Sequence, residues 1–152
     1  MEMRKISTGA AIAIAATGLF MTLLTTGLLM SSQTLQSNGT VTGVNVGVYS
    51  DSSCTQNLTS IDWGSIYPGN STTKIIYVKN TGSLPVTLTM TTGSWVPSNA
   101  NTYISLSWNR ESTVLSAGQS ISATLTLSAS SDAGNITSFS FNMTITGTEQ
   151  AT

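Results

Sequence analysis

Few residues of this chain are able to carry out chemistry. The sequence has no histidine and a single cysteine, Cys54, and charged residues make up only 7% of it. A Ser-His-Asp triad and a zinc site of the Cys/His type are therefore excluded, and no disulfide can form within one chain. The acids Asp51, Asp62 and Asp132 fall in three separate segments, so paired carboxylates are not predicted. We expect no enzyme, no cofactor and no metal site.

Two polar segments leave alternatives open. The loop Asp51-Ser-Ser offers oxygen atoms of the kind that calcium prefers, although a solvated turn is the favoured interpretation. Cys54 lies in the same polar loop, where a small, half-buried residue is favoured over an intermolecular disulfide or a reactive thiol. Arg110 and Glu111 are adjacent in a stretch typical of a hairpin turn. A hydrolase is the least favoured alternative. It needs carboxylates that converge in a cleft, and the acids of this chain fall in separate segments.

Several asparagines stand in the Asn-x-Ser/Thr pattern of N-glycosylation. They are Asn38, Asn57, Asn70, Asn135 and Asn142. The first four fall in predicted turns, where a glycosyltransferase can reach the side chain, and they are our glycosylation candidates. Asn142 falls inside a predicted strand and is the poorer candidate.

The three tryptophans differ in their surroundings. Trp63 and Trp108 alternate with polar neighbours, which is typical of residues that point into a core. Trp95 lies in a predicted loop from Gly93 to Thr102. It is therefore the aromatic residue that we expect as an exposed contact for a partner or a ligand.

An apolar run from Ile6 to Met30 precedes all of these residues and contains neither charge nor proline. At about 1.5 Å per helical residue it is long enough to cross a bilayer core of roughly 30 Å. It is longer than the apolar region of a secretory signal, and no Ala-x-Ala pattern follows it, which favours a retained signal-anchor. Arg4 and Lys5 predict a cytoplasmic N-terminus, residues 1–5, and an extracytoplasmic C-terminal domain.

After a polar spacer, residues 31–39, the hydrophobic period changes from helical to two. The alternation predicts seven strands at spacings near ten residues, with no helix between them: 44–49, 61–63, 71–79, 84–90, 104–108, 121–127 and 139–145. This pattern favours a mainly β fold, an immunoglobulin-like Greek-key sandwich over residues 40–147 with a polar tail at 148–152. In the strand 71–79 the run Lys-Ile-Ile-Tyr-Val is apolar on both faces and leaves the inward set open.

The polarity of this domain comes from serine and threonine rather than from charge. The formal net charge of the chain is -1, and no basic cluster follows the apolar run. The electrostatic footprint of a nucleic-acid-binding protein is therefore absent. Because hydroxyl groups stay neutral, the solubility of such a domain depends little on pH or salt, which suits a surface protein.

Two short motifs carry a resemblance to a known family. The segments Ile66 to Ser71, Ile-Tyr-Pro-Gly-Asn-Ser, and Lys79 to Gly82, Lys-Asn-Thr-Gly, resemble a turn and a strand end in extracellular immunoglobulin-like domains. These domains are common on archaeal surfaces and similar in pattern to the TasA-camelysin group. The resemblance covers most of 40–147 and implies a sandwich that serves as a fibre subunit, an adhesin or a stalk. In TasA-type fibres a short N-terminal strand completes the neighbouring subunit's sheet, a part that the resemblance assigns to Val41 to Val48.

An apolar helix followed by a Ser/Thr-rich β-sandwich is also similar to archaeal type IV pilins. The chain departs from their processing signal, because Thr8 rather than a charged residue precedes Gly9.

We expect a non-enzymatic structural protein of the cell surface, with the lipid bilayer as its partner through Ile6 to Met30. One alternative is a filament or pilus subunit that assembles by strand donation or by helix packing through small residues, Gly18, Thr22 and Thr26. Another is a binding module that uses the segment Gly93 to Thr102. The first residue of the mature protein distinguishes these hypotheses. A start at Met1 indicates an anchor, a start at Ala10 indicates a processed pilin, and a start between Ser31 and Gln36 indicates a secreted subunit.

Overall fold

The computed structural model describes residues 35–150, with the side chains of Gln36 and Val44 excepted. The segment Ile6 to Met30, the cytoplasmic residues 1–5 and the helix-packing positions Gly18, Thr22 and Thr26 lie outside the described residues. Within residues 35–150 no helix has the length and apolar character that a membrane span requires.

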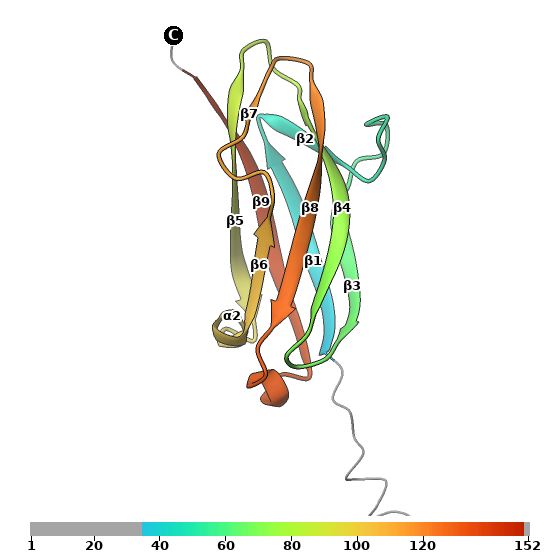
Figure 1. The fold of residues 1–152 in the computed structure, drawn as a ribbon, viewed down its shortest axis with the longest axis vertical. Helices are drawn as coiled ribbons and strands as arrows, with labels where there is room; N and C mark the ends of the chain where they lie inside the picture. Colours follow the sequence, from blue (N-terminus) through green and yellow to red (C-terminus); the bar gives the residue numbers. More distant parts are fainter. Residues whose placement is uncertain (1–34, 151–152) are drawn as a thin grey trace, which may run out of the picture. The chain divides into compact units, whose positions relative to one another are not determined.

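The described chain is built almost entirely of strands (Figure 1). In chain order these are β1 (Leu35–Val44), β2 (Val46–Tyr49), β3 (Ser60–Ile66), β4 (Ser71–Asn80), β5 (Val86–Val96), β6 (Ile104–Trp108), β7 (Val114–Leu115), β8 (Ser120–Ala129) and β9 (Ser138–Glu149). A short helix, α2 (Ala100–Tyr103), lies between β5 and β6, and a 3-10 turn, η1 (Ala133–Asn135), lies between β8 and β9.

These strands form two sheets that pack as a β-sandwich, which confirms the mainly β prediction. Sheet A has the order β3-β1-β9-β5-β7 and sheet B the order β2-β4-β8-β6. Neighbouring strands are antiparallel except β1 and β9, which run parallel from Gln36 beside Ser138 to Val44 beside Thr146. The core therefore lies between two sheets that face each other over most of their length (Figure 1).

The chain passes from sheet A to sheet B at one residue, Asn45. Asn45 has a φ of 59°, and its side-chain amide donates to the carbonyl oxygen of Gly147 at 3.2 Å. A β-carbon at Gly43 would overlap the carbonyl oxygen of Val46, so this tight crossing requires glycine at that position. The first predicted strand, 44–49, is thus divided between the end of β1 and the whole of β2.

Alternating residues of both sheets fill the core, as the period of two predicts. The buried apolar set of β8 and β9 is Ala123, Leu125, Leu127, Ala129, Phe139, Phe141, Met143 and Ile145. Each large side chain of this kind contributes roughly 1.5–3 kcal/mol when it leaves water. In β4 the inward residues are Ile76 and Val78, whereas Ile75 is 62% exposed, which resolves the set that the sequence leaves open.

The predicted number of seven strands is too low, because the described residues form nine. The spacer expected at 31–39 overlaps β1, which begins at Leu35. The inward positions of β1 include Ser37 and Gly39, so the strand lacks the apolar alternation that identifies a half-buried strand. Strand β7 has only two residues, too few to show a period, and β9 continues to Glu149, into the expected tail.

A buried asparagine fixes the turn between β4 and β5. Asn80 is completely buried, and its amide nitrogen donates to the carbonyl oxygens of Leu84 at 2.8 Å and Leu115 at 2.9 Å. Its side-chain oxygen accepts the backbone N–H of Gly82 at 2.9 Å. Three hydrogen bonds thus satisfy the amide and tie the turn to β7, which explains an asparagine at the end of a core strand.

Candidate functional site

Trp95 lies in strand β5 rather than in the predicted loop, because β5 continues to Val96. Between Gly93 and Val96 the pairing with β9 slips by one residue, and Ser94 there has a φ of 52°. A β-bulge of this kind changes the direction of the following side chain. The indole therefore faces inward and stacks on Phe141, with ring centroids 4.4 Å apart and planes 18° apart.

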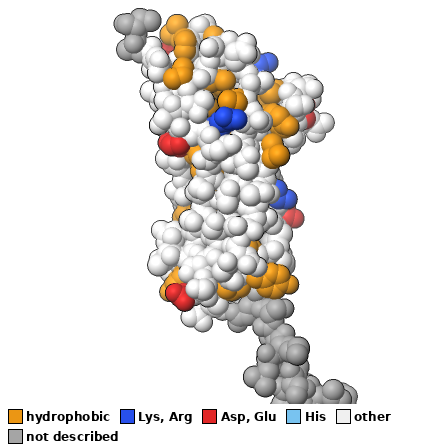
Figure 2. Space-filling model, viewed as in Figure 1, with side chains coloured by type: hydrophobic (Ala, Val, Ile, Leu, Met, Phe, Trp, Pro, Cys, Tyr) orange, Lys and Arg blue, Asp and Glu red, His pale blue; other side chains and the backbone are white. Residues whose placement is uncertain are grey.

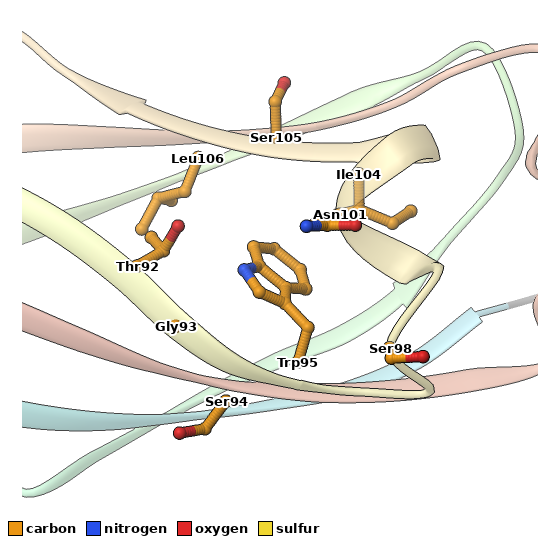
Figure 3. A pocket seen from close by; sticks show the side chains of 9 residues that line it. All are labelled: Thr92, Gly93, Ser94, Trp95, Ser98, Asn101, Ile104, Ser105 and Leu106. Atoms are coloured by element: carbon orange, nitrogen blue, oxygen red, sulfur yellow. The ribbon is translucent and has the colours of Figure 1, made fainter.

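The sandwich is open beside Trp95 because two edge strands meet there. In the described chain β7 covers only Val86 and Thr87 of β5, and β6 pairs with β8 alone. Beyond β7, Leu88 exchanges backbone hydrogen bonds with Ser112 and Thr113, and the Glu111 carboxylate accepts the backbone N–H of Met90 at 3.2 Å, so these residues occupy the edge of β5 as far as Met90. Farther along, a groove of about 480 Å³ separates β5 from β6 and is bounded at one end by α2 (Figure 3).

The walls of this groove carry no charge. They are formed by Thr92, Gly93, Ser94, Trp95, Ser98, Asn101, Ile104, Ser105 and Leu106. Figure 3 shows the side chains of Thr92, Asn101 and Leu106 around the indole, whereas those of Ser94 and Ser105 point away from it. Within residues 35–150 no partner accepts or donates a hydrogen bond to the Thr92 hydroxyl, the Asn101 amide or the Trp95 Nε1–H. The groove therefore combines an aromatic surface with uncommitted polar groups.

The acids named from the sequence do not converge. In the loop after β2, Asp51 accepts the backbone N–H groups of Thr55 at 3.0 Å and Gln56 at 2.8 Å. The Gln56 N–H is the main cause that holds the pKa of Asp51 below its usual value of 3.8. Asp62 accepts the N–H of Gly64 in β3. Among residues 35–150 no three acidic or thiol side chains are placed to share a metal ion. Asp51 thus closes its own loop, as expected of a solvated turn.

The glycosylation candidates are all exposed, but they do not all lie in turns. Asn57 lies in the loop between β2 and β3, Asn70 in the turn before β4, and Asn135 at the end of η1. The predicted turn at Asn38 is wrong, because this residue lies inside β1 between β3 and β9. Its backbone is held in the middle of a sheet, as is that of Asn142, so the turn positions are the more accessible acceptors.

The other residues named from the sequence lie away from the groove floor. Trp63 is in the core, 4% exposed, as predicted. Trp108 is partly buried against the core, and its Nε1–H donates to Glu111 at 2.6 Å. Arg110 donates through Nε to the carbonyl oxygen of Ser122 in β8. The turn that contains Arg110 and Glu111 joins β6 to β7, which belong to different sheets, so it is not the predicted hairpin. Cys54 is a free, half-buried thiol in its loop. None of these side chains lines the groove beside Trp95.

Two parts of this site are not evident in the sequence. Phe141 is a predicted core residue, but its role as the support of Trp95 depends on the bulge at Ser94, which no sequence period reveals. The sequence does not distinguish Asn101 and Thr92 from other polar residues. The fold places Asn101 on α2 and Thr92 on β5, and both line the same groove.

Models of known protein families and curated proteins were both compared with the chain, and neither comparison finds a match. The resemblances to TasA-type subunits and to type IV pilins therefore remain predictions from the sequence.

Proposed function

We propose that the protein is a non-enzymatic structural component of the cell surface, an extracytoplasmic β-sandwich held at the membrane by Ile6 to Met30. The observation that carries this proposal is the neutral, hydroxyl-rich outer surface. On sheet A the exposed side chains of β1, β9 and β5 are mostly serine, threonine and asparagine, with Val96 at the end of β5 as an apolar exception. Neighbours in register form rows such as Thr91, Thr144 and Thr42. Figure 2 shows charged side chains only as isolated spots on the face in view.

A surface of this composition suits exposure to a changing medium. Hydroxyl and amide groups do not titrate, and salt screens only interactions between charges. The hydration of the domain therefore depends little on pH or ionic strength, as a protein outside the cell requires.

The immunoglobulin-like, TasA-related interpretation is part of the same proposal. Its two motifs lie at the two ends of β4: Ile66 to Ser71 spans the turn into the strand, and Lys79 to Gly82 contains Asn80, whose hydrogen bonds close the turn that follows. The positions of the two motifs, one in a turn and one at a strand end, are the observations that support this interpretation.

Fractionation of the native cells tests the anchored structural role. We expect the full chain in the membrane fraction, resistant to alkaline carbonate, with a mature N-terminus at Met1 and with the β domain accessible to protease added outside the cell. Recovery from the cytosol would contradict the proposal, and a start at Ala10 or near Ser31 would replace the anchor by a pilin or a secreted subunit.

A filament subunit that exchanges its first strand is the second candidate. Strand β1 lies between β3 and β9, and one residue, Asn45, joins it to β2. If β1 swings out about Asn45, the place between β3 and β9 becomes open to β1 of another copy. Against this, β1 is paired with β3 from Leu35 to Thr40 and with β9 from Gln36 to Val44, so the segment Val41 to Val44 is held along its β9 edge in the monomer. We therefore favour the anchored monomer.

Engineered cysteines distinguish the two candidates. Thr40 of β1 and Ser60 of β3 are opposite each other in register and both exposed, so cysteines at these positions are suited to a disulfide. In a Cys54→Ser background, the anchored monomer predicts that T40C/S60C oxidises within one chain and runs as a monomer without reductant. A ladder of disulfide-linked multimers, absent from each single-cysteine control, would instead support strand exchange.

A further inference from the structure

We propose that the groove beside Trp95 is a binding site for a neutral saccharide. This inference goes beyond the structural role proposed above and does not depend on how the chain is held at the membrane. A sugar ring presents C–H groups on its faces and hydroxyl groups around its rim. A binding site for it needs an aromatic surface with uncharged donors and acceptors beside it, and the groove provides both.

The aromatic surface is rigid. Trp95 stacks on Phe141, and Phe139 lies nearly parallel with its centroid 6.2 Å from each of the other two rings. Both phenylalanines are buried, whereas Trp95 is only partly buried at the edge of the core. An indole held in this way loses little conformational freedom when a ligand packs on it, which lowers the entropic cost of binding.

The polar groups match the hydroxyl rim. The amide of Asn101 and the hydroxyl of Thr92 each donate and accept, and the Trp95 Nε1–H donates. None of the three is engaged within the described residues, and Figure 3 shows the first two beside the indole. Sugar hydroxyls also donate and accept, so they can replace the water that these groups bind in the free protein.

The absence of charge from the walls selects a neutral ligand. A phosphorylated or acidic sugar brings a negative charge into a partly desolvated groove, and among the nine lining residues no basic side chain compensates it. The nearest acid in this edge, Glu111, is held by the N–H of Met90 and the indole of Trp108. The volume of about 480 Å³ lies within the range of about 300–1,000 Å³ that is typical of small-molecule sites.

An extended peptide is a poorer occupant. Strand addition to β5 needs a regular ladder of free backbone groups, but the bulge at Ser94 interrupts this edge next to the groove, and Glu111 already occupies it at Met90. The same two features leave room beside Trp95 for a ligand that does not need a continuous strand edge.

Titration with defined sugars tests the proposal. The full chain is purified in a detergent without a sugar head group, and maltotriose, cellotriose, mannotriose and chitotriose are added up to about 10 mM, the range of weak binding. We expect at least one of them to change the tryptophan fluorescence saturably and to shift the NMR signal of the Trp95 indole N–H, while trigalacturonate, an acidic trisaccharide, does neither. The proposal is wrong if no neutral sugar binds saturably, or if trigalacturonate binds equally well.

Three variants locate the site. Asn101→Ala and Thr92→Val each remove one hydrogen-bonding group from an exposed position and are expected to weaken binding by about three- to tenfold. Ser105→Ala is the matched control, because its side chain lines the same groove but points away from the indole, and its affinity is expected to be unchanged. Circular dichroism checks that the fold is retained. Equal affinity of all three variants and the parent would place the sugar elsewhere and overturn the assignment.

Discussion

Trp63 and Trp95 lie on strands to either side of Phe141 in sheet A, yet one is buried in the core and the other borders a groove. Across sheet A the order of strands places Trp63 on β3 and Trp95 on β5, with β1 and β9 between them. Trp63 is 4% exposed, and its Nε1–H is buried without a hydrogen-bond partner among the described residues. Trp95 is partly exposed, and its Nε1–H faces a groove.

The connections between the sheets account for this difference. On the side of Trp63, β3 ends at Ile66 and β4 begins at Ser71, so a four-residue turn draws the two sheets together. On the side of Trp95, seven residues that include α2 separate Val96 from Ile104 and keep β5 and β6 apart. The same residue type therefore becomes core on one side and a candidate contact surface on the other. We call the side of Trp63 the closed side and the side of Trp95 the open side.

The largest expected effect comes from removing the ring that both sides share. Phe141→Ala deletes a buried side chain, 2% exposed, that supports Trp95 by stacking and lies beside the closed side. We expect a loss of about 3–5 kcal/mol in the free energy of unfolding, measured by chemical denaturation. Asn142→Ala, the exposed neighbour on the same strand, is the control and should change stability by less than about 0.5 kcal/mol. Similar losses for both variants would contradict the shared core.

Substitutions at two glycines test how tightly the closed side and the open side are packed. A β-carbon at Gly39 would lie 3.2 Å from Trp63 Nε1 and 3.6 Å from Phe141 Cζ, whereas one at Gly93 meets no atom within 4 Å. Gly39→Val should therefore overpack the closed side and lower stability by about 1–3 kcal/mol. Gly93→Val should change stability by less than about 0.5 kcal/mol. Thermal unfolding of the two variants gives the comparison, and equal losses would show that the open side is as tightly packed as the closed one.

The sequence predicts the closed side better than the open one. The inward rows of β8 and β9 and the burial of Trp63 follow from alternation, because a period of two assigns each side chain to a face. Trp95 breaks that rule: a one-residue bulge at Ser94 decides which face it takes, and the chemistry of neighbouring residues does not encode the slip. Loop lengths also look alike in sequence, so the groove left by α2 cannot be read from composition.

Strand β1 shows a second limit of the sequence. Its inward position Gly39 is small, because the rings of Trp63 and Phe141 lie within 4 Å of a β-carbon built there. Ser37 and Gly39 interrupt the apolar alternation between Leu35 and Val41, so the segment resembles a polar spacer in sequence. The sequence accordingly predicts a turn at Asn38, and its place in the middle of sheet A depends on pairing with residues far away in the chain.

A smaller effect concerns the buried hydroxyl of Ser37. This side chain is 3% exposed, and its Oγ has no hydrogen-bond partner among the described residues. Ser37→Ala removes an unsatisfied polar atom and should raise the free energy of unfolding by about 1 kcal/mol. On the open side, Thr92→Val removes a hydroxyl that reaches water and should stay within about 0.5 kcal/mol of the parent. If Ser37→Ala is destabilising, the Ser37 hydroxyl has a hydrogen-bond partner, such as an internal water, and is not the unsatisfied group that the described residues indicate.

The smallest effect is expected from acid, in the loop that precedes β3. The pKa of Asp51 is lowered, mainly by the Gln56 N–H, so the folded chain binds a proton there less readily than the unfolded chain, whose pKa is near the usual 3.8. This contribution to stability is complete above that value and is lost as the pH falls through the lowered pKa.

NMR titration should show the amide signals of Thr55 and Gln56 moving together with the Asp51 carboxyl, and Asp51→Asn should abolish that transition. The indole signals of Trp63 and Trp95 should stay constant over the same range, because neither side of Phe141 depends on this carboxylate. Indole signals that move with the same midpoint would show that the loop and the closed side unfold as one unit.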